Sequence, residues 1–210
     1  YRSVRLFANS TTDENSVVIN DGEFVGQVWL QSSNAKAQNV TLTINGGTLT
    51  NQANYSTMRI WTSNTDAEKC AVEINGGTFN GCIDFQAHNN NYPTIPHYGT
   101  LTVNNGTFNA DTFTKSAIRV LRFGVNAEDM HATINGGNFD ATVGGMTNAM
   151  INVAENAVVT INGGTFKNVN GVIPQFAPYM STYEKNGKLI INDGNFYGGW
   201  RFNGGTATTD

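Results

Sequence analysis

The sequence predicts an all-β solenoid, a fold in which each structural repeat buries its apolar face by stacking on its neighbours. The main observation is a motif of the form Ile-Asn-Gly-Gly-Thr-Phe, whose seven copies begin 25 to 31 residues apart. A fixed period in this range is typical of solenoids. The copies begin at Ile19, Ile44, Ile74, Val103, Ile134, Ile161 and Ile191. Because they span the chain without a linker, we expect one domain over residues 1–210.

A short alternating segment runs into each motif copy, as in Leu42-Thr43-Ile44. Alternation with a period of two predicts a half-buried strand whose outer two residues point inward and whose middle residue points outward. We call this the first strand of each repeat. The other first strands are expected at 17–19, 72–74, 101–103, 132–134, 159–161 and 189–191.

The motif itself predicts a bend followed by a second strand. Asn tolerates the left-handed backbone conformation, and Gly follows where a side chain would clash. The Gly-Thr-Phe part then forms a second strand that sends Phe inward. Because the copies stack, their asparagines are expected to form a ladder inside the coil, made of Asn20, Asn45, Asn75, Asn104, Asn135, Asn162 and Asn192.

A third alternating segment follows each motif copy, for example Met58-Arg59-Ile60 and Ile83-Asp84-Phe85. The other third strands are expected at 4–6, 28–30, 118–120, 151–153 and 200–202, with a degenerate copy at 172–174. Three strands per repeat predict a single-stranded parallel β-helix of about seven turns. Loops of variable length then join each third strand to the next first strand.

The column of asparagines resembles the asparagine ladder of the right-handed parallel β-helix proteins typified by pectate lyases. This resemblance covers nearly the whole chain, and it implies a right-handed coil. The repeats are also similar to those of large surface proteins of Gram-positive bacteria, which implies an extracellular or cell-surface location. Since a fold does not determine its chemistry, the repeated Asn, Gly, Thr and Phe are interpreted as structural residues.

Composition excludes several classes of function. Charged residues make up 13 % of the chain and the net charge is −4, so no basic surface for nucleic acid is expected. No apolar run approaches the ~20 residues required to cross a membrane.

The two cysteines, Cys70 and Cys82, are expected as free, partly buried thiols on different sides of the turn. The chain begins in mid-repeat at Tyr1 and neither end carries a cap, so we expect a domain excised from a longer protein.

The candidate binding residues lie on the outward side of the third strands, where the repeat is most irregular. Adjacent turns lie about 4.8 Å apart, so Arg59, Asp84 and Arg119 are expected to form a plus-minus-plus row. One interpretation is a charge-balanced exposed sheet that contributes little energy. The other is contact with a ligand or partner, because a soluble surface rarely presents Trp without one. The predicted site contains Trp29, Arg59, Trp61, Asp84, Gln86 and Arg119.

A second candidate is the aromatic and proline-containing segment that follows the third strand near residue 86. Long loops of this composition are often binding loops, although a loop stiffened by proline and packed over its own turn is the alternative. No third metal ligand has a recognisable spacing to the two histidines, so neither a metal nor a cofactor is predicted. The residues singled out in this segment are His88, Tyr92, His97 and Tyr98.

Three functions compete for this chain. The resemblance implies a polysaccharide lyase or glycoside hydrolase, yet such enzymes need clustered carboxylates, and the third-strand face carries Asp84 alone. Ice binding needs a flat threonine array, which Glu73 interrupts. We therefore predict a non-catalytic binding or adhesin module of a secreted or cell-surface bacterial protein, monomeric as an isolated domain. Its partner would be a host protein, such as immunoglobulin or mucin, or a glycan; the alternative is a lyase or hydrolase acting on an acidic polysaccharide.

Overall fold

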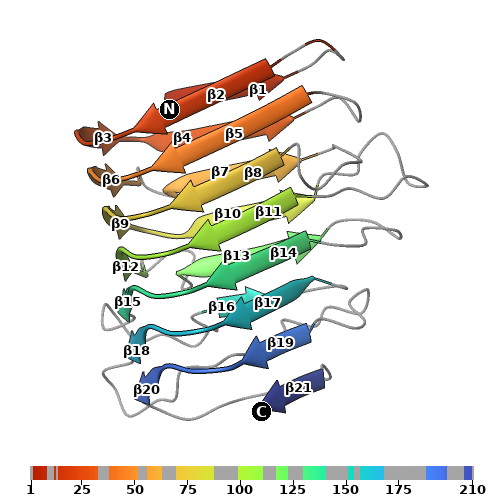
Figure 1. Ribbon diagram of the computed structural model, residues 1–210. Coiled ribbons are helices and arrows are strands. Elements are labelled where there is room, and N and C mark those ends of the chain that lie inside the picture. Colours follow the sequence, from red (N-terminus) through yellow and green to blue (C-terminus); the bar gives the residue numbers. More distant parts are fainter. Residues whose placement is uncertain are drawn as a thin grey trace.

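The protein is a parallel β-solenoid, in which successive turns stack along one axis from the N-terminal to the C-terminal end (Figure 1). The computed structural model describes residues 2–8, 12, 14–32, 38–51, 56–62, 70–87, 99–110, 117–122, 130–140, 151–153, 157–167, 188–197 and 206–209. These residues contain strands and turns and no helix, so none of them forms a helix that could cross a membrane.

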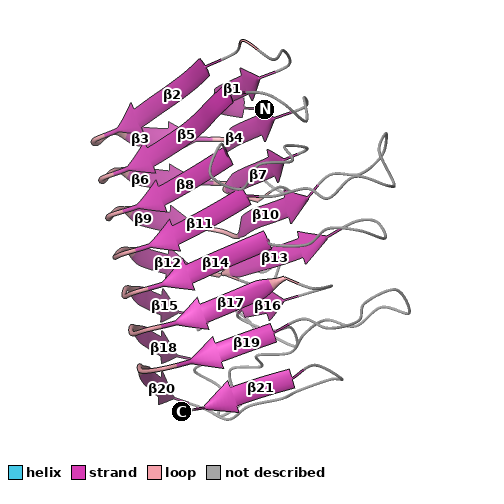
Figure 2. Ribbon diagram, turned by 45° about the vertical axis from the view of Figure 1, so that its right-hand side comes forward, coloured by secondary structure: helices cyan, strands magenta, loops and turns pink. Residues whose placement is uncertain are grey.

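Three parallel sheets run along the solenoid, one for each strand of the repeat (Figure 2). The first-strand sheet contains β2 (Glu14–Ile19), β5 (Gln38–Ile44), β8 (Cys70–Ile74), β11 (Gly99–Val103), β14 (Met130–Ile134), β17 (Val158–Ile161), β19 (Lys188–Ile191) and β21 (Thr206–Thr209). The second-strand sheet contains β3 (Glu23–Val25), β6 (Thr48–Thr50), β9 (Thr78–Asn80), β12 (Thr107–Asn109), β15 (Asn138–Asp140), β18 (Thr165–Lys167) and β20 (Asn195–Tyr197). The third-strand sheet contains β1 (Arg2–Ala8), β4 (Gln27–Ser32), β7 (Met58–Thr62), β10 (Ile83–Ala87), β13 (Ile118–Arg122) and β16 (Ile151–Val153).

The alternation predicted for the first strands is confirmed. In β5 the side chains of Leu42 and Ile44 are buried, whereas Thr43 between them is half-buried. Each strand pairs with the same strand of the next turn, so that Ile19 lies beside Ile44 and Ile44 lies beside Ile74. Equivalent motif positions therefore stack on one another through the first-strand and second-strand sheets.

The two glycines of the motif are required by the close approach of neighbouring turns. A Cβ atom at Gly46 would lie 2.7 Å from the carbonyl oxygen of Asn20, which is closer than real contacts allow. Gly47 has φ +92° and so occupies the left-handed region that favours glycine. Three turns instead carry an Asp or Asn in the first of these positions, and its side-chain oxygen accepts a hydrogen bond from the next glycine N–H. These residues are Asp21, Asn105 and Asp193.

The asparagine ladder is present, but it lies on the outside of the coil. In every consecutive pair the Nδ2 atom of one asparagine donates to Oδ1 of the asparagine one turn earlier, at distances of 2.7 to 3.0 Å. The prediction of an internal ladder is wrong, because Asn20 and four others of the seven are exposed and Asn75 and Asn104 are half-buried. The reason is the strand alternation itself: Ile19 points inward, so the next residue points outward.

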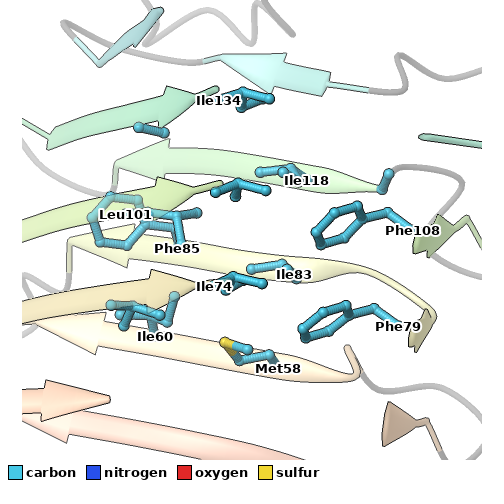
Figure 3. Packing of buried hydrophobic residues seen from close by; sticks show 14 of the residues in the cluster. Met58, Ile60, Ile74, Phe79, Ile83, Phe85, Leu101, Phe108, Ile118 and Ile134 are labelled. Atoms are coloured by element: carbon cyan, nitrogen blue, oxygen red, sulfur yellow. The ribbon is translucent and has the colours of Figure 1, made fainter. Parts of the chain in front are cut away.

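The interior is filled by apolar side chains from all three sheets, including Ile60, Ile74, Phe85 and Phe108 (Figure 3). The motif phenylalanines form a continuous stack within it. Their ring centroids lie 4.6 to 4.9 Å apart and their planes differ by 7 to 9°, from Phe79 through Phe196. Stacking of this kind stabilises aromatic pairs beyond the burial of their area. The prediction that the motif Phe points inward is confirmed.

The number of turns is confirmed only in part. At least four consecutive turns carry all three strands, but seven complete turns are not confirmed, because β16 is the last described strand of the third-strand sheet. The third strands predicted at 172–174 and 200–202 lie outside the described residues. The strand Thr206–Thr209 was not predicted; it pairs with β19, which places Ala207 beside Leu189. Neither cysteine forms a disulfide, as predicted, and both are fully buried rather than partly buried.

Candidate binding face on the third-strand sheet

The third-strand sheet places the predicted site residues in two neighbouring columns along the strands. Trp29 pairs with Arg59, Arg59 with Asp84, and Asp84 with Arg119 in successive turns. In the second column Gln31 pairs with Trp61, and Trp61 pairs with Gln86. The strand register that the sequence predicts for the site is therefore confirmed.

Two tryptophans form the centre of this face. The rings of Trp29 and Trp61 stack with their centroids 5.7 Å apart and their planes at 15°. Sequence reasoning placed both rings on an exposed surface, but Trp29 is only 9 % exposed and Trp61 is half-buried. Trp29 is nevertheless absent from the apolar core, which contains its strand neighbours Val28 and Leu30. It is an outward-pointing side chain that other side chains cover.

Arginine side chains provide this cover. The guanidinium carbon of Arg2 lies 3.7 Å from the centroid of the Trp29 ring, and those of Arg5 and Arg59 lie 5.5 and 5.8 Å away. A guanidinium over an indole face is attracted by the negative face of the ring. Arg5 also donates from Nη2 to Oε1 of Gln31 at 3.2 Å. We call Arg2, Arg5, Arg59 and Trp29 the arginine cluster.

The positive charges of this cluster act on one another. Partial desolvation lowers the pKa of Arg2 below its ordinary value, and the charges of Arg5 and Arg59 lower it further. The sequence alone does not identify Arg2 as part of this face, because Arg2 precedes the alternating segment predicted at residues 4–6. The signal that identifies it is the strand pairing, which places it beside Gln27 at the start of β4.

Asp84 is fully buried on the same face. Its Oδ2 atom lies 3.9 Å from Nη2 of Arg59, whose side chain is 30 % exposed. The thiol of Cys82 also approaches Oδ1 of Asp84, at 4.0 Å. A buried carboxylate is stable only with compensating partners, so Asp84 serves as a counter-charge within the sheet.

Two buried N–H donors of the cluster have no hydrogen-bond acceptor among the residues that the structure describes. They are Nε1 of Trp29 and Nε of Arg59. Buried donors are almost always satisfied in folded proteins, so each such group needs an explanation.

Part of the predicted site is outside the description. For Gln86 and Arg119 the structure gives the strand positions but no side-chain environment. The second candidate segment, with His88, Tyr92, His97 and Tyr98, lies wholly outside the described residues. Within the described part of the chain, no group of three or more His, Cys, Asp or Glu side chains is placed to hold a metal ion.

An open groove of about 430 Å³ lies on a different part of the surface, along the turns between the first and second strands. The glycine pairs of two neighbouring turns and threonines of the second strands are among the residues that line it. Sequence reasoning treated these residues as structural. The lining residues are Asp21, Gly46, Gly47, Thr48, Gly76, Gly77, Thr78, Asn105, Gly106, Thr107 and Asn138.

Comparison with known proteins does not assign this chain to a family. No protein-family model matches the chain, and no curated protein and no solved structure matches it either.

Proposed function

We propose that this chain is a non-catalytic binding module of a secreted or cell-surface protein, and that it recognises a glycan or a host protein through the outer face of the third-strand sheet. The proposal includes a right-handed coil of the pectate-lyase type with about seven turns, monomeric as an isolated domain. The parallel three-sheet repeat supports this architecture.

The observation that carries the proposal is the stack of Trp29 and Trp61, with the guanidinium groups of three arginines around the Trp29 ring. Trp and Arg are the residue types most enriched among residues that dominate binding energy at interfaces. The two rings also belong to a regular sheet, and side chains on regular strands are held more rigidly than side chains on loops. The face therefore offers a preorganised contact surface.

The alternative, cleavage of an acidic polysaccharide, depends on Asp84 as the carboxylate of this face. A general acid or a Ca²⁺ ligand must reach the substrate or the ion, whereas Asp84 is fully buried and faces Arg59. This position supports a structural role for Asp84. We expect the purified chain to release neither unsaturated uronides nor new reducing ends from acidic polysaccharides. Release of either product that is lost in Asp84→Asn would favour the enzyme.

The test of binding combines a glycan array with a pull-down from host secretions, both using the whole chain. For the ligand identified, Trp61→Ala should weaken binding by about 2 kcal/mol or more, because it removes the exposed part of the aromatic stack. The matched control is Thr78→Ala, which alters a half-buried side chain of the second-strand sheet. Arg59→Ala is a poorer test, since it also leaves buried Asp84 without this counter-charge.

Thermal melts of each variant establish that it is folded before its affinity is compared. If Thr78→Ala abolishes binding while Trp61→Ala has no effect, the third-strand face is the wrong surface.

A further inference from the structure

The arginine cluster concentrates positive charge on a protein that is negative as a whole. The chain has 12 Lys and Arg against 16 Asp and Glu, yet Arg2, Arg5 and Arg59 surround one indole ring. Asp84 lies 3.9 Å from Arg59. Like charges held this close raise the free energy of the folded state unless an anion lies between them. Desolvation lowers the pKa of Arg2, and the charges of Arg5 and Arg59 lower it further.

The polar side-chain groups of the arginine cluster are all hydrogen-bond donors. Guanidinium and indole groups donate hydrogen bonds and accept none. Trp29, which is 9 % exposed, keeps its buried Nε1–H without an acceptor among the described residues, and so does Nε–H of Arg59. A ligand atom that contacts the exposed guanidinium groups of Arg2 and Arg5 must therefore be an acceptor, and an acceptor with negative charge gains most from them. Carboxylate and sulfate oxygens meet both conditions.

The neighbouring side chains favour a sugar chain as the carrier of that anion. Trp61 stacks beside Trp29 and is half-buried, so part of a flat ring remains available to the CH face of a sugar. Gln31 lies in the same column as Trp61 and hydrogen-bonds Arg5, which places an amide next to the charged group. A polymer lying along the solenoid axis would meet these columns in successive turns.

We infer that the arginine cluster is an anion-binding site, and that the ligand of this face is a glycan bearing carboxylate or sulfate groups. The inference rests on the proposed binding function and adds to it the chemical class of the ligand and the residues Arg2 and Arg5, which recognise its charge.

The test measures binding of four probes to the whole chain by calorimetry and tryptophan fluorescence. The probes are a hyaluronan oligosaccharide with carboxylates, a heparin oligosaccharide with sulfates as well, a neutral dextran oligosaccharide, and polyglutamate. We expect one or both anionic glycans to bind and the dextran not to bind. Affinity should also fall as salt is raised from 50 to 500 mM, a range that shortens the screening length from roughly 14 to about 4 Å.

Charge-removing variants locate the site. Arg2→Gln and Arg5→Gln should each weaken binding of the anionic glycan about tenfold, the loss typical of one charge-assisted hydrogen bond. Both side chains are exposed, so these variants should fold normally. Lys188→Gln is the matched control: it removes the same charge from an exposed position of the first-strand sheet, and it should leave affinity unchanged.

The remaining outcomes overturn the inference in distinguishable ways. Binding of dextran alone, sensitive to Trp61→Ala but not to Arg5→Gln, would leave the binding face in place and remove the anion site. Polyglutamate binding as tightly as the glycans would assign the site to an acidic peptide. Equal weakening by Lys188→Gln would indicate a general charge effect, and failure of every probe to bind would refute the ligand class.

Discussion

The external asparagine ladder makes a quantitative prediction for Asn104→Ala. Asn104 donates from Nδ2 to Oδ1 of Asn75 at 2.8 Å and to Oε1 of Glu73 at 3.0 Å, and it accepts from Nδ2 of Asn135 at 2.8 Å. A protein hydrogen bond contributes roughly 0.5–1.5 kcal/mol, so three bonds would contribute at most about 4.5 kcal/mol. The ladder borders solvent, however, and the released amides regain water. We therefore expect a loss of about 1–2 kcal/mol in the free energy of unfolding.

Position along the ladder provides the internal control. Asn192 is exposed and donates one bond, to Asn162 at 2.7 Å, within the described ladder. Asn192→Ala should cost about 0.5–1 kcal/mol, less than the interior substitution. A second variant, Asn104→Asp, cannot donate to either neighbour and places a carboxylate beside Glu73. It should be more destabilising than Asn104→Ala at neutral pH.

The repulsion between the introduced carboxylate and Glu73 determines how the stability of Asn104→Asp depends on pH. Glu73 disfavours the charged form of the introduced carboxyl group in the folded protein, so its folded pKa should exceed its unfolded pKa. The extra destabilisation is then present above the folded pKa and is lost as pH falls through it.

Urea unfolding followed by tryptophan fluorescence measures all three variants, with equal m-values as the condition for comparing them. The reasoning would be refuted if Asn104→Ala were neutral, or if Asn104→Ala and Asn192→Ala lost the same free energy. The first result would mean that the Asn104 amide contributes nothing beyond its exchange with water, and the second that the loss does not depend on the number of ladder bonds removed.

Two further predictions concern the core and the turns, and both use the same unfolding measurement. Phe108→Leu removes ring stacks at 4.9 and 4.6 Å, each worth ~0.5–1.5 kcal/mol, so it should cost about 1–3 kcal/mol. Phe24→Leu, which faces a leucine in the next turn, should cost less than about 1 kcal/mol. Gly76→Ala would bring a Cβ within 2.7 Å of the carbonyl oxygen of Asn45 and should cost about 1–3 kcal/mol. Asn105→Ala, at the equivalent position of a turn that already holds a side chain, should cost less, and equal losses within either pair would contradict these assignments.

The repeat could be predicted from the sequence because its signal is local and is copied in every turn. The alternation around Leu42 and Ile44 determines which side chains enter the core, and the repeated motif determines which residues pair between turns. The stacking of the motif copies predicts the ladder, but the inference that the ladder lies inside the coil is wrong. Alternation alone places Asn20 outside, directly after the inward Ile19.

What the sequence could not provide is the environment of side chains that meet across turns. Trp29 follows the outward pattern, yet it is buried because Arg2, from another turn, lies over its ring. Asp84 has the same outward position and is buried beside Arg59. The strand Thr206–Thr209 has a weak pattern of its own and exists through pairing with β19, which is the tertiary override of strand propensity.

The constancy of the strand register has a consequence for engineering. Motif copies are 25 to 31 residues apart, yet Ile44, Ile74 and Val103 stay aligned through the first-strand sheet. The differences in length are therefore accommodated outside these aligned segments, and register shifts within strands occur only near the N-terminal end among the described pairs, in β1–β4 and β2–β5. A guest peptide inserted between a third strand and the next first strand would leave the neighbouring turns in alignment. The solenoid can therefore display inserted peptides at a spacing fixed by the repeat.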